Sequence, residues 1–277
     1  MKRPGGKNQI QRLCTMLDAF GLKHVSRNLP TLLGEAEAGE QSYRDFLLGA
    51  LDVEVKGRNE RRRHRNYVGA HFPPACRALE EFDPAELDSG ITNGQIRQLK
   101  DLSWLDSHGN ILLAGPPGLG KTMIALGLGL HAINEGYTVC FEKMTDFCDI
   151  LARSSHERNA GFRLRNIRKA QLFILDEVGY KTITREQANQ LFCFVSDAYE
   201  KSSIIFTTNK EIPDWVEMMG DPVLTAAMLD RILHHARCFS LKGESYRLKH
   251  PELFAGVEWP SEAGTGSSTL DSEGRVK

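Results

Sequence analysis

The chain has 277 residues, of which 41% are hydrophobic and 26% charged, a composition that suits a folded protein with a sizeable core. We find no apolar run long enough for a transmembrane helix and no signal peptide near the start, so we expect a cytoplasmic protein without a membrane partner. The net charge of −1 is unevenly spread: residues 1–77 carry 14 Lys and Arg against 8 Asp and Glu, and the remainder carries 21 against 28. This asymmetry indicates different partners for the two parts.

The leading residues show the spacing of amphipathic helices. Apolar side chains recur every three or four residues in 9–20 and in 41–56, and Ser42 is the predicted N-cap of the second helix. The stretch 34–40, rich in Gly and Glu, predicts an exposed connection. We therefore expect a small all-helical domain over 1–82.

A basic run ends this helical part. Residues 58–65 read RNERRRHR, and on a helix most of the arginines would share one face at i, i+3, i+4 and i+7 spacing. Such a face suits the phosphate oxygens of double-stranded DNA and predicts backbone contacts with little sequence preference. A charge run is also typical of a solvated helix face, so both interpretations stay open. The candidate DNA contacts are Arg58, Arg61, Arg62, Arg63 and Arg65.

The pattern changes at residue 110, where short apolar segments begin to alternate with helical ones. This alternation predicts an α/β domain with a central parallel five-stranded sheet covered by helices on both faces. The predicted strands are 110–114, 138–142, 171–177, 203–209 and 238–241, and the predicted helices after the second strand are 145–154, 185–200 and 222–235.

These patterns divide the rest of the chain into three parts. A linker with a short helix at roughly 94–106 is expected over 83–109, and the α/β domain over 110–260. The small polar residues of 261–277 cannot bury enough apolar surface to offset ordering, so they predict a disordered tail. The six cysteines and nine histidines form no zinc-binding pattern.

The turn after the first predicted strand carries a phosphate-binding motif. Residues 115–122 read GPPGLGKT, which fits Gly-x-x-x-x-Gly-Lys-Ser/Thr between a strand and a helix. Its glycines let the backbone amides curl around phosphates, Lys121 supplies a cation to the β- and γ-phosphates, and the Thr122 hydroxyl coordinates Mg²⁺. The motif therefore predicts ATP and Mg²⁺ as cofactors. The candidate ATP-binding residues are Gly115, Pro116, Pro117, Gly118, Leu119, Gly120, Lys121 and Thr122.

Two acids, Asp176 and Glu177, end the predicted strand 171–177. Ligands of parallel sheets bind at this edge, so we expect Asp176 to hold the Mg²⁺ shell, mainly through water. Glu177 would polarise the water that attacks the γ-phosphate. An isolated acid pair is also typical of a solvated turn, but the phosphate loop favours the catalytic interpretation.

These features resemble the AAA+ ATPases, whose fold is a three-layer αβα domain. The resemblance implies that strand 203–209 lies between the two strands that carry the site, and that Asn209 orients the attacking water. It also implies an arginine acting on the nucleotide of a neighbouring subunit, for which Arg231 is the first candidate. Arg247 is a candidate sensor of the γ-phosphate. A capping role for Asn209 and surface roles for both arginines stay open.

Longer segments are similar to the IstB-like ATP-binding proteins, helper ATPases of insertion-sequence transposition that are related to DnaC-type helicase loaders. The similarity extends from about Leu13 to Leu248 and includes RNERRRHRNYVGAHFPP, LEEFDPAELDSGI, QLFILDEVGY and LKGESYRL. It implies an ATP-hydrolysing homo-oligomer that assembles with ATP on double-stranded DNA and recruits a transposase. A DnaC-like helicase loader, and a DNA-binding protein that uses ATP only as a structural switch, remain alternatives.

Overall fold

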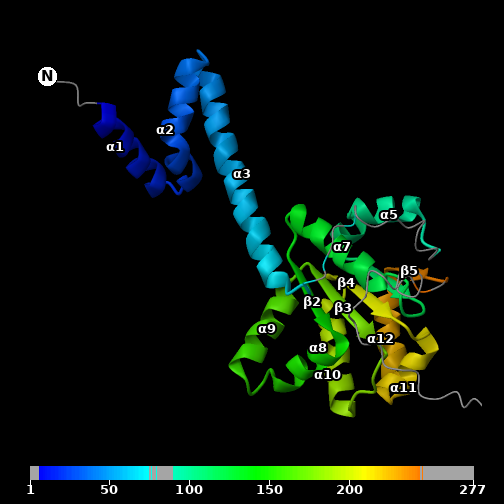
Figure 1. The fold of residues 1–277 in the computed structure, drawn as a ribbon. Helices are drawn as coiled ribbons and strands as arrows, with labels where there is room; N and C mark the ends of the chain where they lie inside the picture. Colours follow the sequence, from blue (N-terminus) through cyan, green and yellow to red (C-terminus); the bar gives the residue numbers. More distant parts are fainter. Residues whose placement is uncertain (1–5, 75, 77–78, 80–89, 244, 246–277) are drawn as a thin grey trace, which may run out of the picture.

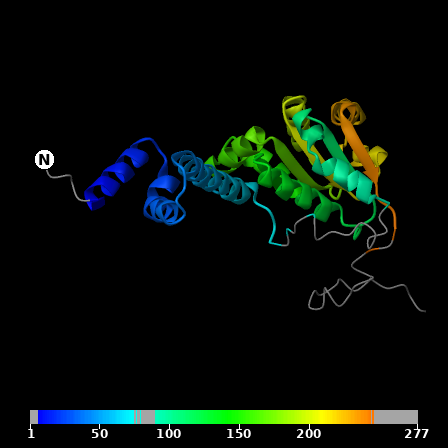
Figure 2. The same cartoon turned by 90° about the horizontal axis from the view of Figure 1, so that it is seen from above.

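Three helices lead into a sheet domain in the computed structural model, which describes residues 6–74, 76, 79, 90–243 and 245. They are α1 (Gly6–Ala19), α2 (Lys23–Ala38) and α3 (Tyr43–Ala70). Helix α2 packs on both neighbours, and the end of α3 packs on the sheet domain, so the leading helices extend away from it (Figure 1, Figure 2). No helix in the described part of the chain has the length and apolar composition needed to cross a bilayer.

The leading helices agree with the predicted periodicity except at one connection. Ser42 caps α3 as predicted, because its side-chain oxygen accepts a hydrogen bond from the backbone N–H of Asp45 at 3.2 Å. The predicted connection over 34–40 is wrong for its first five residues, since α2 continues to Ala38. The Glu and Ala residues of this stretch are strong helix formers, and their propensity outweighs Gly34.

Glu54 of α3 fixes the angle between α3 and α2. It is 4% exposed, and its Oε2 accepts hydrogen bonds from the backbone N–H groups of His24 and Val25 at 2.8 and 3.1 Å. These donors lie in the first turn of α2 and lack helical partners. Burial raises the pKa of Glu54, but hydrogen bonds from Arg58, Val25 and His24 outweigh this and lower the pKa overall. The contact between α3 and the start of α2 therefore favours the ionised form of Glu54.

The sheet has five parallel strands in the order β2-β3-β4-β1-β5. This confirms the predicted parallel sheet, with strand bounds that differ from prediction by at most two residues. Asn209 lies just beyond its strand. The strands are β1 (Asn110–Ala114), β2 (Val139–Lys143), β3 (Leu172–Val178), β4 (Ser203–Thr208) and β5 (Ala236–Ser240).

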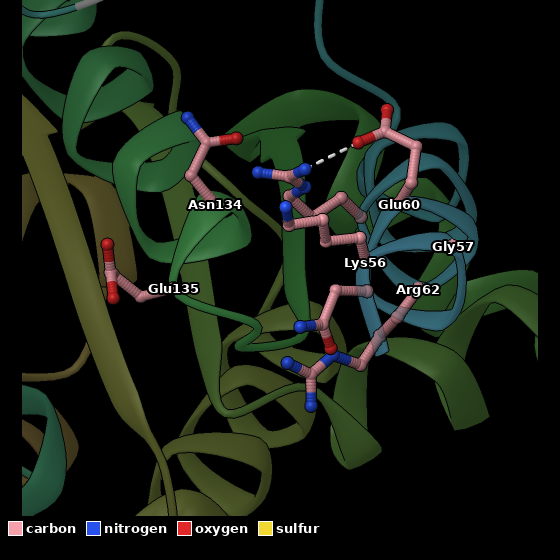
Figure 3. A pocket seen from close by; sticks show the side chains of 8 residues that line it. Lys56, Gly57, Glu60, Arg62, Asn134 and Glu135 are labelled. Atoms are coloured by element: carbon pink, nitrogen blue, oxygen red, sulfur yellow. Dashed lines mark hydrogen bonds and ion pairs between the residues drawn. The ribbon is translucent and has the colours of Figure 1, made fainter. Parts of the chain in front are cut away.

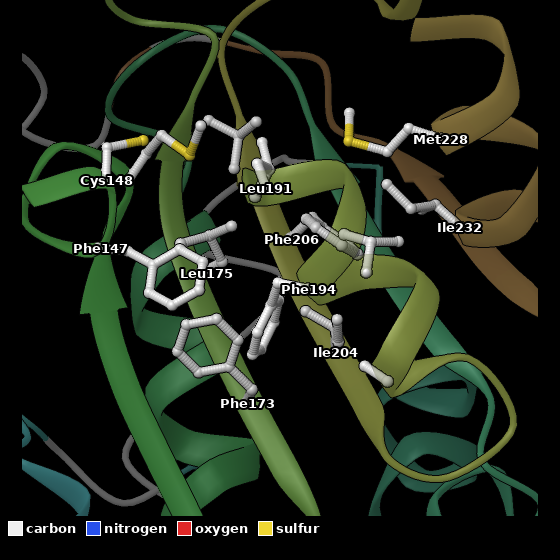
Figure 4. Close-up of a cluster of buried hydrophobic side chains, with 14 of the residues drawn as sticks. Phe147, Cys148, Phe173, Leu175, Leu191, Phe194, Ile204, Phe206, Met228 and Ile232 are labelled. Atoms are coloured by element: carbon white, nitrogen blue, oxygen red, sulfur yellow. The ribbon is translucent and has the colours of Figure 1, made fainter. Parts of the chain in front are cut away.

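Alternate side chains of the strands face two separate cores. Ile111 and Leu113 join the core under the first helix layer, whereas Leu112 joins the core under the second. Figure 4 shows the second core, where Phe147, Phe173 and Phe194 pack against one another. The first layer contains α5 (Asn93–Lys100), α6 (Ser103–Asp106) and α7 (Lys121–Asn134). The second contains α8 (Met144–Arg153), α9 (Arg158–Lys169), α10 (Arg185–Ala198), α11 (Trp215–Met219) and α12 (Pro222–His234), with a 3₁₀ turn at Ile212–Asp214.

Other helices also differ from the sequence prediction. The single helix expected at 94–106 is divided into α5 and α6, because Leu102 takes a left-handed backbone conformation (φ 58°) between them. Helix α9 was not predicted, because its sequence RNAGFRLRNIRK is mostly charged or polar and has only a short apolar stripe. The predicted tail 261–277 and linker residues 83–89 lie outside the described residues.

We predict that Glu54→Gln lowers the free energy of unfolding by about 1–2 kcal/mol at neutral pH, the difference between charged and neutral hydrogen bonds. The folded state depresses the pKa of this carboxyl, so its stabilisation is present above the ordinary carboxyl pKa and is lost as pH falls through the folded value. Thermal unfolding from pH 7 downward measures this difference, with the exposed Glu37→Gln as control. If the difference in unfolding free energy between Glu54→Gln and wild type does not change with pH, the stabilising role of the ionised Glu54 is contradicted.

Candidate functional site

The predicted phosphate loop connects the end of β1 to the first residue of α7. Gly115, Gly118 and Gly120 have φ values of 146°, 86° and 77°, which favour glycine. A Cβ on Gly115 would lie 2.3 Å from the carbonyl oxygen of Leu241, and one on Gly118 would lie 2.0 Å from Ser245 Oγ. The segment after β5 therefore lies directly against this loop, and any larger residue would displace it.

The loop turns its backbone toward the N-terminus of α7. Gly120 is the N-cap of this helix and makes no side-chain hydrogen bond to its first turn, and a helix N-terminus favours an anion. The buried Lys121 donates from Nζ to the carbonyl oxygens of Gly115 and Pro116, each at 2.6 Å. Leu119 is fully buried in the first core and anchors the loop. The geometry thus suits a phosphate group.

Asp176 is the polar centre beside this loop. It is 2% exposed, and its Oδ1 accepts hydrogen bonds from Thr122 Oγ1 at 2.7 Å and from Thr207 Oγ1 at 2.5 Å. A carboxylate next to a threonine hydroxyl is the set of oxygen ligands that Mg²⁺ prefers, so these residues fit that ion. Thr207 was missed in the sequence analysis, although paired threonines at the end of an apolar strand were a usable signal.

Glu177 is exposed, in contrast to the buried Asp176, and the strand is irregular at these two residues. Its φ is 61°, and the pairing register of β3 with β4 shifts between Leu175 and Val178. The backbone N–H of Glu177 donates to Thr207 Oγ1 at 3.0 Å, while its exposed side chain pairs with Lys143 Nζ at 3.2 Å. The bulge thus separates a buried acid from an exposed one that lies beside a cation.

The remaining candidates for catalysis lie at different places. Asn209 is exposed and directly follows β4, which lies between β3 and β1 as the AAA+ resemblance implied. Arg247 lies outside the described residues. Arg231 lines a small cavity with Asn110, the first residue of β1, whereas the phosphate loop follows the last residue of that strand. Arg231 therefore does not face the phosphate loop of its own chain.

Contacts within the second helix layer hold Arg231. Its Nη1 donates to the carbonyl oxygen of Ala227 at 2.7 Å, and its guanidinium lies 4.9 Å from the ring centre of Phe192. Stacking on an aromatic ring thus orients this arginine.

Near Arg231, three side chains of metal-ligand type come together from two helix ends. Ligand atoms of Glu200, His234 and His235 lie within 4.8 Å of one another, and all three residues are exposed. Tyr199 shares a hydrogen bond of 2.7 Å with His234 Nδ1. Because these groups come from separate segments, no sequence pattern indicated them, and they lie apart from the phosphate loop.

The predicted basic run lies on α3, and its arginines have different surroundings. Arg61, Arg62 and Arg65 are exposed. Arg58 binds Glu54 through Nε at 2.8 Å and donates from Nη2 to the carbonyl oxygen of Gly21 at 3.0 Å, so it stabilises the helical part. Arg63 pairs with Glu60 at 2.5 Å. Three of the five predicted DNA contacts are thus exposed and do not share the interactions that hold Arg58 and Arg63.

A groove of about 660 Å³ separates this part of α3 from the end of α7. Figure 3 shows Lys56 and Arg62 on the α3 side and Asn134 and Glu135 on the α7 side. The guanidinium of Arg62 lies close to Gly136, since a Cβ there would be 2.6 Å from Arg62 Nη2. Arg62, in the middle of the basic run, therefore lies beside the sheet domain.

The fold is shared with solved structures of DnaI and DnaA. A crystal structure of DnaI superposes with a TM-score of 0.52 at 16% sequence identity, covering 62% of this chain and 95% of that chain. AMPPCP-bound DnaA from Aquifex aeolicus superposes with a TM-score of 0.50 at 19% identity, covering 69% of this chain and 59% of that chain. These likenesses show the fold and agree with the predicted αβα domain around a parallel sheet.

Sequence comparison is more specific. Residues 15–253 match the family described as IstB-like ATP binding protein. An ATP-binding protein of insertion sequence IS21 from Pseudomonas aeruginosa is 38% identical over 248 residues, which is 90% of this chain and 92% of the relative. One of insertion sequence IS5376 from Geobacillus stearothermophilus is 38% identical over 247 residues, covering 89% and 96%. The chain therefore belongs to the IstB-like ATP-binding proteins of insertion sequences, the family that its sequence motifs predicted.

Proposed function

We propose that this ATP-binding protein hydrolyses ATP, assembles on double-stranded DNA as a homo-oligomer and recruits or stimulates a transposase. The observation that carries the proposal is the buried carboxylate of Asp176, bonded to Thr122 at the phosphate loop. A carboxylate in a core is costly unless it binds a cation or hydrogen-bond donors, so its position beside the loop favours a role with Mg²⁺ and phosphates.

The residues of the loop divide the work of binding. Backbone amides from Gly115 to Thr122 receive the phosphate oxygens, and Lys121 balances the charge of the β- and γ-phosphates. Thr122 and Asp176 are the residues that would hold Mg²⁺, which when bound neutralises the charge that develops on the γ-phosphate.

Glu177 is the proposed base for hydrolysis. Its carboxylate is exposed and 3.2 Å from Lys143 Nζ, so it must leave this cation to accept a proton from the attacking water. Asn209, at the end of the neighbouring strand, would orient that water. Arg231 lies near the first residue of β1, and the phosphate loop follows the last residue of that strand. We therefore assign Arg231 to the nucleotide of an adjacent subunit.

The exposed Arg61, Arg62 and Arg65 are the proposed contacts to DNA phosphates. The names of the relatives place them in insertion sequences, which is the reason for inferring a transposase partner. A helicase loader with the same fold would need a protein partner for its leading helices, and a row of open arginines suits phosphates better.

We predict that Glu177→Gln keeps ATP affinity within about threefold but lowers turnover by at least roughly 100-fold, because it loses its base. Phosphate release and binding of a fluorescent ATP analogue measure the two quantities. Lys121→Ala should instead lose nucleotide binding, and the exposed Glu186→Gln should match wild type. Normal turnover in Glu177→Gln would remove its catalytic assignment.

Thr207→Val removes the hydroxyl that orients Asp176 while keeping the shape of the side chain. We expect the Mg²⁺ concentration for half-maximal turnover to rise about 10-fold, the lower end of the range for the loss of a group that orients a metal ligand. Thr207→Ser keeps the hydroxyl and is the matched control. An unchanged Mg²⁺ requirement in the valine variant would show that Thr207 has no such role.

Charge reversal of Arg61, Arg62 and Arg65 to Glu should weaken duplex DNA binding at every salt concentration. The slope of log affinity against log salt should fall by about 2–3, since each phosphate contact contributes roughly 0.9. Reversal of the exposed Arg97, Arg185 and Lys201 changes the net charge equally and serves as control. Equal affinity and slope in both triple variants would reduce the basic run to a solvated face.

A further inference from the structure

Arg163 of α9 is a buried cation that the proposed reaction does not use. It is 8% exposed, and its guanidinium binds two consecutive residues of β2. Nε pairs with Glu142 Oε1 at 2.5 Å, and Nη2 donates to the carbonyl oxygen of Phe141 at 2.9 Å. The end of β2 is thus held by one side chain from the second helix layer.

The same guanidinium also holds the end of α3. Its Nη1 donates to the carbonyl oxygen of Gly69 at 3.0 Å, and its Nη2 donates to that of Ala70 at 3.4 Å. Carbonyl groups in the last turn of a helix lack helical partners and favour a nearby cation. Arg163 supplies both the hydrogen-bond donors and the positive charge. One planar group therefore joins the basic helix to β2.

A second attachment joins α3 to the start of β2. Asn66 donates from Nδ2 to the carbonyl oxygen of Tyr137 at 2.9 Å, just before the strand. The ring of Phe72, after α3, packs edge-on against Phe141 at 6.5 Å. Because β2 is an edge strand of the sheet, these contacts make the end of α3 and β2 one mechanical unit.

The last residue of β2 reaches the proposed base. Lys143 directly follows Glu142, lies in register with Asp176 and pairs with Glu177 at 3.2 Å. A buried ion pair such as Arg163–Glu142 contributes little net stability relative to an apolar pair, so the geometry that it fixes is its main physical consequence. Adjacent residues of β2 thus hold the basic helix on one side and Glu177 on the other.

We propose that Arg163 is a positioning residue through which DNA on α3 controls Glu177, an inference that rests on the proposed function. Phosphates that bind Arg61, Arg62 and Arg65 pull on α3, and Arg163 passes this displacement to Glu142 and the end of β2. Lys143 then leaves Glu177, whose carboxylate becomes available to accept a proton from the attacking water. DNA therefore stimulates ATP hydrolysis by way of Arg163.

The test uses Arg163→Lys in the full-length protein. Lysine keeps the charge, but a single ammonium group cannot bind α3 and β2 in the planar geometry of a guanidinium. ATP turnover is measured with and without duplex DNA, together with ATP affinity, DNA affinity and the melting temperature. We expect the ratio of DNA-stimulated to basal turnover to fall to about 1, with both affinities within about threefold of wild type. The exposed Arg165→Lys on the same helix is the control and should keep the wild-type ratio.

Lys143→Met provides an independent arm, because Lys143 is exposed and its loss leaves the core intact. We expect its basal turnover without DNA to approach the DNA-stimulated rate of the wild-type protein, with little further increase on adding DNA. An unchanged basal rate in this variant would overturn the proposal.

The remaining outcomes separate this inference from the proposed function. If Arg163→Lys keeps the wild-type ratio, or if both of its rates fall together with the melting temperature, Arg163 has a structural role and the inference fails. If the wild-type protein hydrolyses ATP without any stimulation by DNA, the inference fails while the ATPase assignment stands. If Glu177→Gln turns over ATP normally, the proposed function itself fails.

Discussion

The buried carboxylate of Asp176 is the constraint on which the site depends. Two threonine hydroxyls, one from α7 and one from β4, donate to the same oxygen and compensate for its removal from water. These bonds fix α7, β3 and β4 relative to one another at the end of the sheet where the phosphate loop begins. Glu177, the next residue, lies in the same irregular part of β3 and is exposed, so one short segment presents two acids in two environments.

The edge strand β2 gives this site a connection to the leading helices. Arg163 and Asn66 tie the end of α3 to β2, while Lys143 of the same strand reaches Glu177. The exposed arginines and the nucleotide site therefore belong to one continuous structure rather than to two independent modules. Arg231 lies where β1 begins, at the end of the strand away from its own phosphate loop. This position suits a protein whose complete site needs an adjacent copy.

Local patterns in the sequence predicted much of this structure. The phosphate loop, the acid pair and the five strands follow from short motifs and apolar runs, because each depends on neighbouring residues in the chain. Residues whose surroundings come from distant segments were missed: Thr207 meets Asp176 across strands, and Arg163 lies on a charged helix whose apolar stripe is short. Arg58 shares the spacing of the predicted DNA contacts, and its partner Glu54 is recognisable as a buried cap of α2 only in three dimensions.

We expect the turn after β1 to bind a triphosphate whose Mg²⁺ would be held by Thr122 and Asp176. A crystal structure with Mg²⁺ and a non-hydrolysable ATP analogue tests this most directly. We expect the β- and γ-phosphates on the amides of residues 115–122, with Mg²⁺ beside Thr122 and Asp176. A nucleotide bound elsewhere, or an analogue whose phosphates make no contact with this turn, would contradict it.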